Sequence, residues 1–276
     1  MPGRETPHRT LDPLVLIKTA GPAGMPGMDH ARFLGHLDDE FARFRAAAAS
    51  GLSAPVPTCP GWTVADLARH VGEVYLEKAR TVREGAEPEP WPPPGLAAED
   101  PLALLDRSYP DLRGELAARA PGDPSVTWYG PDQTVGFLMR RMAHETLIHR
   151  IDAELGAGRP VGDVPPDLAA DGIDELLKVC VAYAVAEWSE EFTGVLGGAP
   201  ERTYALRTDG AAWAVRSGPD LFDVQDGPGG GPADVTLTGP PDALLRWVWN
   251  RGGDVRIEGD PEAVAVLRRC IAIATQ

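Results

Sequence analysis

The sequence predicts two kinds of structure in one chain, a bundle of four to five helices followed by a small α+β domain. Apolar residues recur at helical spacing through residues 29–192, whereas short alternating segments separated by Gly- and Pro-rich turns begin near residue 200. A length of 276 residues suits about two domains of roughly 150 residues each. We therefore expect a disordered extension over residues 1–28, a helical bundle over 29–192 and an α+β domain over 200–276.

The first part of the chain carries the start and stop signals of five helices. Thr63 has the residue type of an N-cap, and Asp66 stands three positions later, where a capping box needs an acceptor. Segments rich in Pro and Gly interrupt the helical patterns and are expected to be loops. The expected helices cover residues 29–50, a segment that follows Thr63 and ends near residue 84, and residues 99–119, 133–155 and 167–190.

The last part of the chain has the sequence pattern of β-strands. TYALRT and AAWAVRS flank Asp209-Gly210, a dipeptide typical of hairpin turns. After the GPGGG loop, the segments are expected to form a strand, a helix, a strand and a closing helix, namely ADVTLTG, PPDALLRWVWN, DVRIEG and DPEAVAVLRRCIAIA. The GPGGG loop does not open a helix as a phosphate-binding loop would, so we assign it no nucleotide role.

Composition excludes several classes of function. The chain has 26 Lys and Arg against 41 Asp and Glu, a formal net charge of −15, which argues against nucleic acid and against a polybasic membrane anchor. Cys59, Cys180 and Cys270 are far apart, so neither a disulfide framework nor a thiolate zinc site is expected. A cytoplasmic protein without a membrane span fits these features best.

A pair of candidate metal ligands lies in the string HETLIH. At about 100° per residue, His144 and His149 are about 140° apart on a helix and cannot both ligate one metal. Glu145 and His149 are only about 40° apart, on one face. His70 is the candidate third ligand, because it shares the inner face of the second helix with Leu67. Three such ligands leave a position for water or substrate, as in catalytic zinc sites.

Plainer interpretations stay open on spacing alone. A single inward histidine is often a hydrogen-bonded core residue, and a Glu–His pair four residues apart can be surface electrostatics. Nickel or iron would also accept these ligand types in place of zinc. Asp152, three residues after His149, could orient that imidazole from behind. We expect Trp62 to be a core anchor for the second helix and Cys59 to have a buried structural role.

Two strings resemble the mycothiol-dependent maleylpyruvate isomerase family, whose members are DinB-like metal-binding bundles common in actinobacteria. They are VPTCPGWTVADLARHVGEV and RRMAHETLIHRIDAE. The C-terminal string DVTLTGPPDALLRWVWNR resembles the small sterol-carrier-like domain of that family. The resemblance implies zinc ligands at His70, Glu145 and His149, the same triplet that the helical spacing selects.

The resemblance also implies a reaction. Zinc would activate mycothiol or a similar thiol for attack on a small electrophile, giving cis–trans isomerisation or thiol S-transfer. The resemblance further implies an Arg for an anionic substrate, for which Arg251 is the first candidate and Arg246 the second. His144 is off the ligand face and could contact the substrate or the thiol from the side. The alternatives are a hydrolase or lyase that uses metal-activated water and a non-catalytic binding protein; a monomer or a homodimer is expected.

Overall fold

The computed structural model of the protein describes residues 28–275. The disordered extension expected over 1–28 therefore lies, except for Met28, outside the described residues. Four long helices come first, close to the predicted positions: α1 (His30–Ala49), α2 (Val64–Glu84), α3 (Pro101–Ala117) and α4 (Val135–Gly156). A short 3-10 turn, η1 (Leu96–Ala98), precedes α3. The predicted capping box is present, with reciprocal bonds between Thr63 and Asp66.

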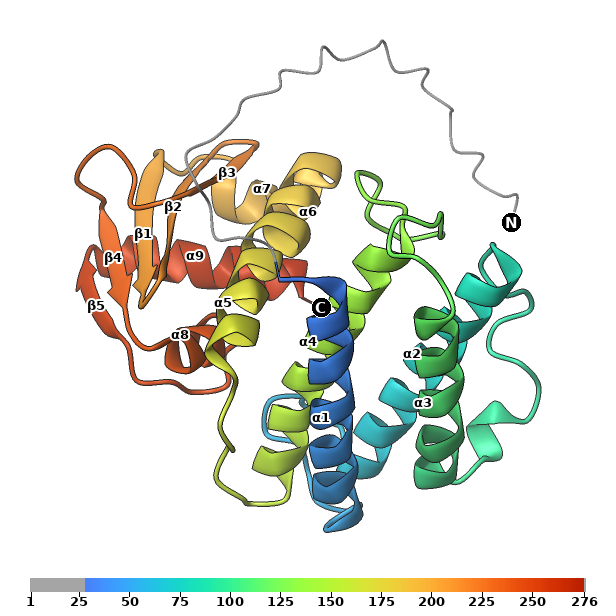
Figure 1. The fold of residues 1–276 in the computed structure, drawn as a ribbon. Coiled ribbons are helices and arrows are strands. Elements are labelled where there is room, and N and C mark those ends of the chain that lie inside the picture. The colour runs from blue at the N-terminus through green and yellow to red at the C-terminus, as the bar shows by residue number, and fades with distance from the viewer. Residues whose placement is uncertain (1–27, 276) are drawn as a thin grey trace, which may run out of the picture.

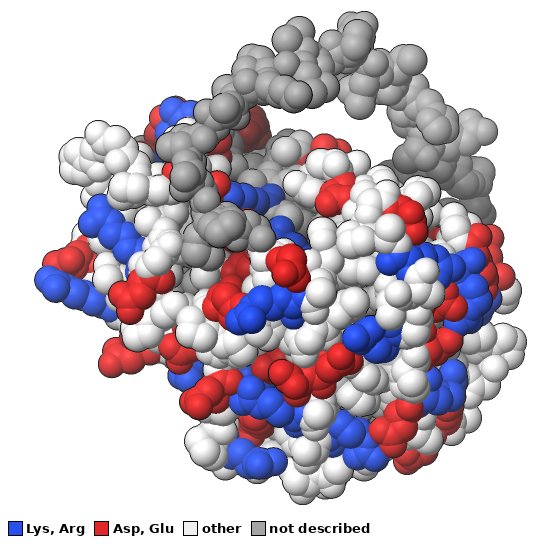
Figure 2. Space-filling view, in the orientation of Figure 1, with Lys and Arg blue, Asp and Glu red and all other residues white. Residues whose placement is uncertain are grey.

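The four helices form a bundle in which α1 packs on α4 and α2 packs on α3 (Figure 1). α4 is buried on most of its circumference, which is why its apolar residues show little helical periodicity. Among residues 28–275, no helix combines the length and apolar character needed to cross a membrane. Acidic and basic side chains are interspersed over the face of the molecule shown in Figure 2.

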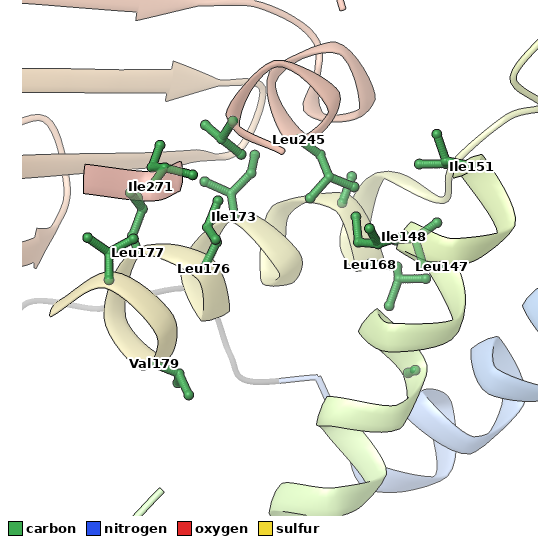
Figure 3. Packing of buried hydrophobic residues seen from close by; sticks show 14 of the residues in the cluster. Leu147, Ile148, Ile151, Leu168, Ile173, Leu176, Leu177, Val179, Leu245 and Ile271 are labelled. Carbon is green, nitrogen blue, oxygen red and sulfur yellow. The ribbon is translucent and has the colours of Figure 1, made fainter. Parts of the chain in front are cut away.

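The helix predicted at 167–190 is more complex than its sequence pattern suggests. It begins as α5 (Pro166–Glu175), widens into a π-helical stretch, η2 (Leu176–Ala182), and continues as α6 (Tyr183–Glu187). The helix is interrupted at Trp188, and α7 (Ser189–Leu196) follows. The apolar side chains of this run face two ways. Figure 3 places Leu168 beside Leu147 and Ile148 of α4, and Leu177 beside Ile271.

A five-stranded sheet follows, with strand order β3-β2-β1-β4-β5. Its strands are β1 (Arg202–Thr208), β2 (Ala211–Gly218), β3 (Leu221–Asp226), β4 (Val235–Thr238) and β5 (Arg256–Gly259). β1 and β2 form the predicted hairpin, while β4 runs parallel to β1. The sequence analysis missed β3, because only Phe222 on it is buried and it becomes a strand by pairing with β2.

Two helices complete the second part, α8 (Pro241–Val248) and α9 (Pro261–Ala274). α8 packs against α5, and α9 packs against α7 and the π-helical stretch. One apolar cluster runs from Phe33 of α1 to Ile271 of α9, so the bundle and the sheet share a continuous core. The predicted fold class, a helical bundle followed by a small α+β part, is confirmed.

Candidate metal centre

α2 and α4 bring the three predicted ligands together. His70 Nε2 lies 3.3 Å from Glu145 Oε1, and His149 Nε2 lies 3.2 Å from the same oxygen. One ligand atom from each residue lies within 4.8 Å of the other two. Two ligands that each lie about 2.0–2.1 Å from a tetrahedral ion are roughly 3.3 Å apart. The donor types and their spacing therefore fit a divalent metal such as zinc.

The cluster is open on the side of α2. The side chain of His70 is 36% exposed, whereas that of His149 is 14% exposed. Trp62 lies beside this opening, with its ring centroid 5.2 Å from that of His70. The prediction of Trp62 as a core anchor is wrong, since Trp62 is 36% exposed. Gly61 adopts a φ of 86° just before it, a left-handed turn that sequence spacing cannot reveal.

Asp152 stands behind His149, as its spacing predicted. Its side chain is fully buried, and Oδ2 lies 3.1 Å from His149 Nδ1. A carboxylate at Nδ1 keeps a proton on that nitrogen, so Nε2, which faces Glu145, is the nitrogen that could ligate a metal. Burial raises the pKa of Asp152, but His149 and Arg251 lower it by more, so that the pKa lies well below its usual value. The carboxylate is therefore charged and can orient the ring.

Two of the candidate ligands, Glu145 and His149, titrate away from their usual ranges. Burial raises the pKa of Glu145, but His149, His70 and Arg141 together lower it well below the ordinary value. Burial lowers the pKa of His149, while Glu145 and Asp152 raise it more, to about 9. Without metal, the His149 imidazole is therefore doubly protonated and positively charged at neutral pH. A metal must displace one of these protons when it binds.

Arg251, the first predicted arginine, contacts the residue behind the cluster. Its Nε donates to Asp152 Oδ1 at 2.8 Å, and its Nη2 donates to Asp152 Oδ2 at 3.0 Å. Its Nη1 donates to the carbonyl oxygen of Trp249. The turn that presents Arg251 depends on Gly253, which has a φ of 91° and whose Cβ, if present, would lie 2.1 Å from the Ala243 carbonyl oxygen.

Arg246, the second predicted arginine, lies on α8 and accepts a backbone hydrogen bond from Arg251 at 2.7 Å. Its Nε is buried and has no hydrogen-bond partner among residues 28–275. A buried donor without an acceptor costs on the order of 1–3 kcal/mol. Arg246 thus offers a donor to which an anionic ligand could bind.

His144 points away from the cluster, as the helical spacing predicted. Its side chain is buried at 1% exposure, with Nε2 2.7 Å from Asp171 Oδ1 of α5. Its ring meets Phe33 edge-on at 5.9 Å. These contacts join α4 to α5 and α1 and involve none of the three clustered residues. The contact of His144 with substrate or thiol stays a prediction.

Sequence reasoning missed a third partner of Glu145, in addition to His70 and His149. Arg141, one turn earlier on α4, donates from Nη2 to Glu145 Oε2 at 3.0 Å, and its Nη1 donates to Glu175 of α5. The four-residue spacing of Arg141 and Glu145 was a visible signal. Glu175 gave none, because it lies 30 residues farther along the chain, outside both motif strings.

The three cysteines are poor nucleophiles. Burial and Asp152 raise the pKa of Cys59 to about 11, and its Sγ lies 3.8 Å from Asp152 Oδ2. Cys59 is half-buried in the loop before α2. Burial, followed by Glu175, raises the pKa of Cys180 to about 12, and burial raises that of Cys270 to about 12. All three thiols are therefore protonated near neutral pH.

Comparison with known proteins places the chain in a family. The family model described as "Mycothiol maleylpyruvate isomerase N-terminal domain" matches residues 34–154, and the "MDMPI C-terminal domain" model matches residues 167–265. The sequence has no significant match among curated proteins. A solved structure of the mycothiol-dependent maleylpyruvate isomerase has the same fold, with a TM-score of 0.55 and 16% identity, covering 85% of this chain and 96% of that one. A structure of its histidine-to-alanine mutant gives the same values. The chain belongs to the mycothiol-dependent maleylpyruvate isomerase family.

Proposed function

We propose that this protein is a zinc-dependent enzyme that uses mycothiol, or a similar small thiol, to isomerise a small electrophilic substrate. His70, Glu145 and His149 would hold the metal, for which nickel and iron are the alternatives to zinc. The observation that carries the proposal is the position of Glu145 Oε1, which lies within 3.3 Å of the Nε2 atoms of both histidines. Family membership supports the thiol and the class of reaction.

Bound together, the metal and the thiol would supply a thiolate whose addition to an activated double bond, followed by rotation and elimination, interconverts cis and trans isomers. The residues of the chain prepare the place for this chemistry. Asp152 holds the Nδ1 side of His149, so that its Nε2 faces the metal position. Exposure of His70 at 36% leaves one side of the cluster open to ligands.

An external thiol is favoured by the state of the chain's own cysteines. Cys59 is the cysteine that contacts Asp152, and its pKa is raised to about 11. At pH 7 a thiol with this pKa is almost entirely protonated, and the thiolate is the reactive form. The reactive thiolate would therefore come from a second molecule, in keeping with the family's thiol dependence.

The two arginines between β4 and β5, Arg246 and Arg251, are proposed to hold an anionic group of the substrate. A guanidinium has five N–H donors, and Arg251 uses Nε and Nη2 on Asp152 and Nη1 on Trp249. Its remaining donors, and the Nε of Arg246, which has no partner among residues 28–275, would donate to a carboxylate of the substrate. We assign Arg251 and Arg246 this role, with Arg251 also bracing Asp152.

Metal content and turnover together test the proposal. The wild type is expected to hold about one zinc per chain, and His70→Ala and Glu145→Ala to lose it. His36→Ala is the matched control, because His36 also contacts a carboxylate, Asp167, but on α1 and α5. Wild-type protein should isomerise maleylpyruvate only when mycothiol is added.

Each other outcome would point to a different function for this protein. A thioether product would replace isomerisation with S-transfer, whereas turnover without thiol would favour metal-activated water. Bound metal without turnover on any electrophile would favour a binding protein. Wild-type protein without metal would contradict the proposal outright.

A further inference from the structure

Arg141 lies between two carboxylates that come from different parts of the chain. Its Nη2 donates to Oε2 of Glu145, on the same helix, at 3.0 Å. Its Nη1 donates to Oε2 of Glu175, the last residue of α5. The Arg141 side chain is 9% exposed and that of Glu175 is 0% exposed. A buried guanidinium between two carboxylates is held in position, because Nη1 and Nη2 each donate to a different carboxylate.

Because of the contact with Arg141, the two carboxylate oxygens of Glu145 have different partners. Oε2 is occupied by Arg141, while Oε1 faces His70 Nε2 and His149 Nε2 at 3.3 and 3.2 Å. The carboxylate is therefore presented to the cluster through one oxygen. An uncompensated cation at Oε2 would draw electron density from Glu145 and make it a weaker metal ligand.

Glu175 supplies the compensation. Its carboxylate is buried and accepts from Arg141 through Oε2, whereas Oε1 has no partner among residues 28–275. Its side-chain hydrogen bond within the described residues is thus made with Arg141. The chain widens into the π-helical stretch directly after Glu175, and such stretches occur often at functional sites.

We propose that Glu175 is a positioning residue for the metal ligand Glu145, acting through Arg141. The inference rests on the proposed metal site. Removal of the Glu175 charge frees Arg141 to move and leaves its full charge on Glu145. Both effects weaken Glu145 as a ligand, so metal affinity falls without any change in the three ligands themselves. A residue of α5 thereby sets the metal affinity of a site whose ligands lie on α2 and α4.

The test compares Glu175→Gln with Asp174→Asn, its neighbour on α5. Asp174 accepts from Arg140 and Trp213 and has no contact with Glu145. Cobalt(II) affinity, measured by competition with a chelator, should fall about 10- to 100-fold in Glu175→Gln. The visible spectrum of the cobalt form should change as well. Asp174→Asn should keep the wild-type affinity and spectrum, even where thermal unfolding of its metal-free form shifts.

Two further variants separate positioning from folding. Glu175→Asp keeps the charge with a shorter reach and should recover part of the affinity. Arg141→Lys keeps a cation without the fork and should lose affinity as Glu175→Gln does. Unchanged affinity and spectrum in folded Glu175→Gln or Arg141→Lys would overturn the inference while the metal site stands. A wild type that binds no cobalt would overturn the proposed function and this inference with it.

Discussion

Asp152 on α4 and Arg251 in the turn after α8 form a two-pronged ion pair, with N–O distances of 2.8 and 3.0 Å. The same carboxylate lies 3.1 Å from His149 Nδ1. The helical bundle and the segment between β4 and β5 therefore meet at a residue that contacts a candidate ligand. Arg141, which contacts Glu175, also contacts Glu145. Two of the three candidate ligands, His149 and Glu145, are therefore each in contact with a buried ion pair.

A double-mutant cycle should reveal strong coupling in this pair. Asp152 is 0% and Arg251 13% exposed, so solvent screens their attraction little. We expect Asp152→Asn, Arg251→Gln and the double variant to give a coupling free energy of about 1–3 kcal/mol in urea unfolding of the metal-free protein. The exposed pair of Arg256 and Glu258 is the control and should couple by less than about 1 kcal/mol. Equal coupling in both pairs would contradict the bracing role.

Metal removal should destabilise the wild type. Because a metal that binds only the folded state stabilises it by mass action, a chelator is expected to lower the Tm of wild-type protein. The His149→Ala variant, which lacks a ligand, should melt at the same temperature with and without chelator. Differential scanning calorimetry at fixed protein concentration measures both. A chelator effect of equal size in the variant would show that the metal binds elsewhere.

Gly253→Ala should disturb the turn that presents Arg251. The φ of 91° disfavours a side chain, and a Cβ would lie 2.1 Å from a backbone oxygen of α8. We expect a loss of about 2–4 kcal/mol in the free energy of unfolding. Gly230→Ala is the matched control, since a Cβ there meets nothing within 4 Å. A stability equal to wild type in Gly253→Ala would show that the turn relaxes without cost.

Acid should weaken the contact between α1 and α5 through Asp167. Burial raises the pKa of Asp167, but hydrogen bonds from Arg32 and His36 lower it by more, so that the pKa is about 2. Because the folded-state pKa is depressed, the contribution is present above the unfolded value of about 4 and is lost as pH falls toward 2.

Partial exposure reduces this contribution to about 1 kcal/mol. Urea unfolding at pH 6 should therefore show wild type more stable than Asp167→Asn by about that amount. At pH 2.5, a value we choose near the folded pKa, the difference should shrink by half or more. A difference that stayed constant between the two pH values would rule out Asp167 as the titrating group.

Features that depend on residues close together along the chain could be predicted from the sequence. The capping box of Thr63 and Asp66, the hairpin turn at Asp209-Gly210 and the common face of Glu145 and His149 all follow from spacing of a few residues. Helix geometry alone also placed His144 on another side of α4, where it contacts Asp171. These features could be predicted because their physics is local.

Tertiary structure decided whatever depends on residues far apart in the chain. β3 is a strand because β2 pairs with it, and Trp62 is exposed because a left-handed turn directs it toward His70. The approach of His70 to Glu145 required α2 and α4 to pack side by side. Glu175 contacts Arg141, and Arg251 contacts Asp152, only because the tertiary structure brings α5 and the turn after α8 next to α4. Buried charges need partners, and packing alone decides which distant residue provides one.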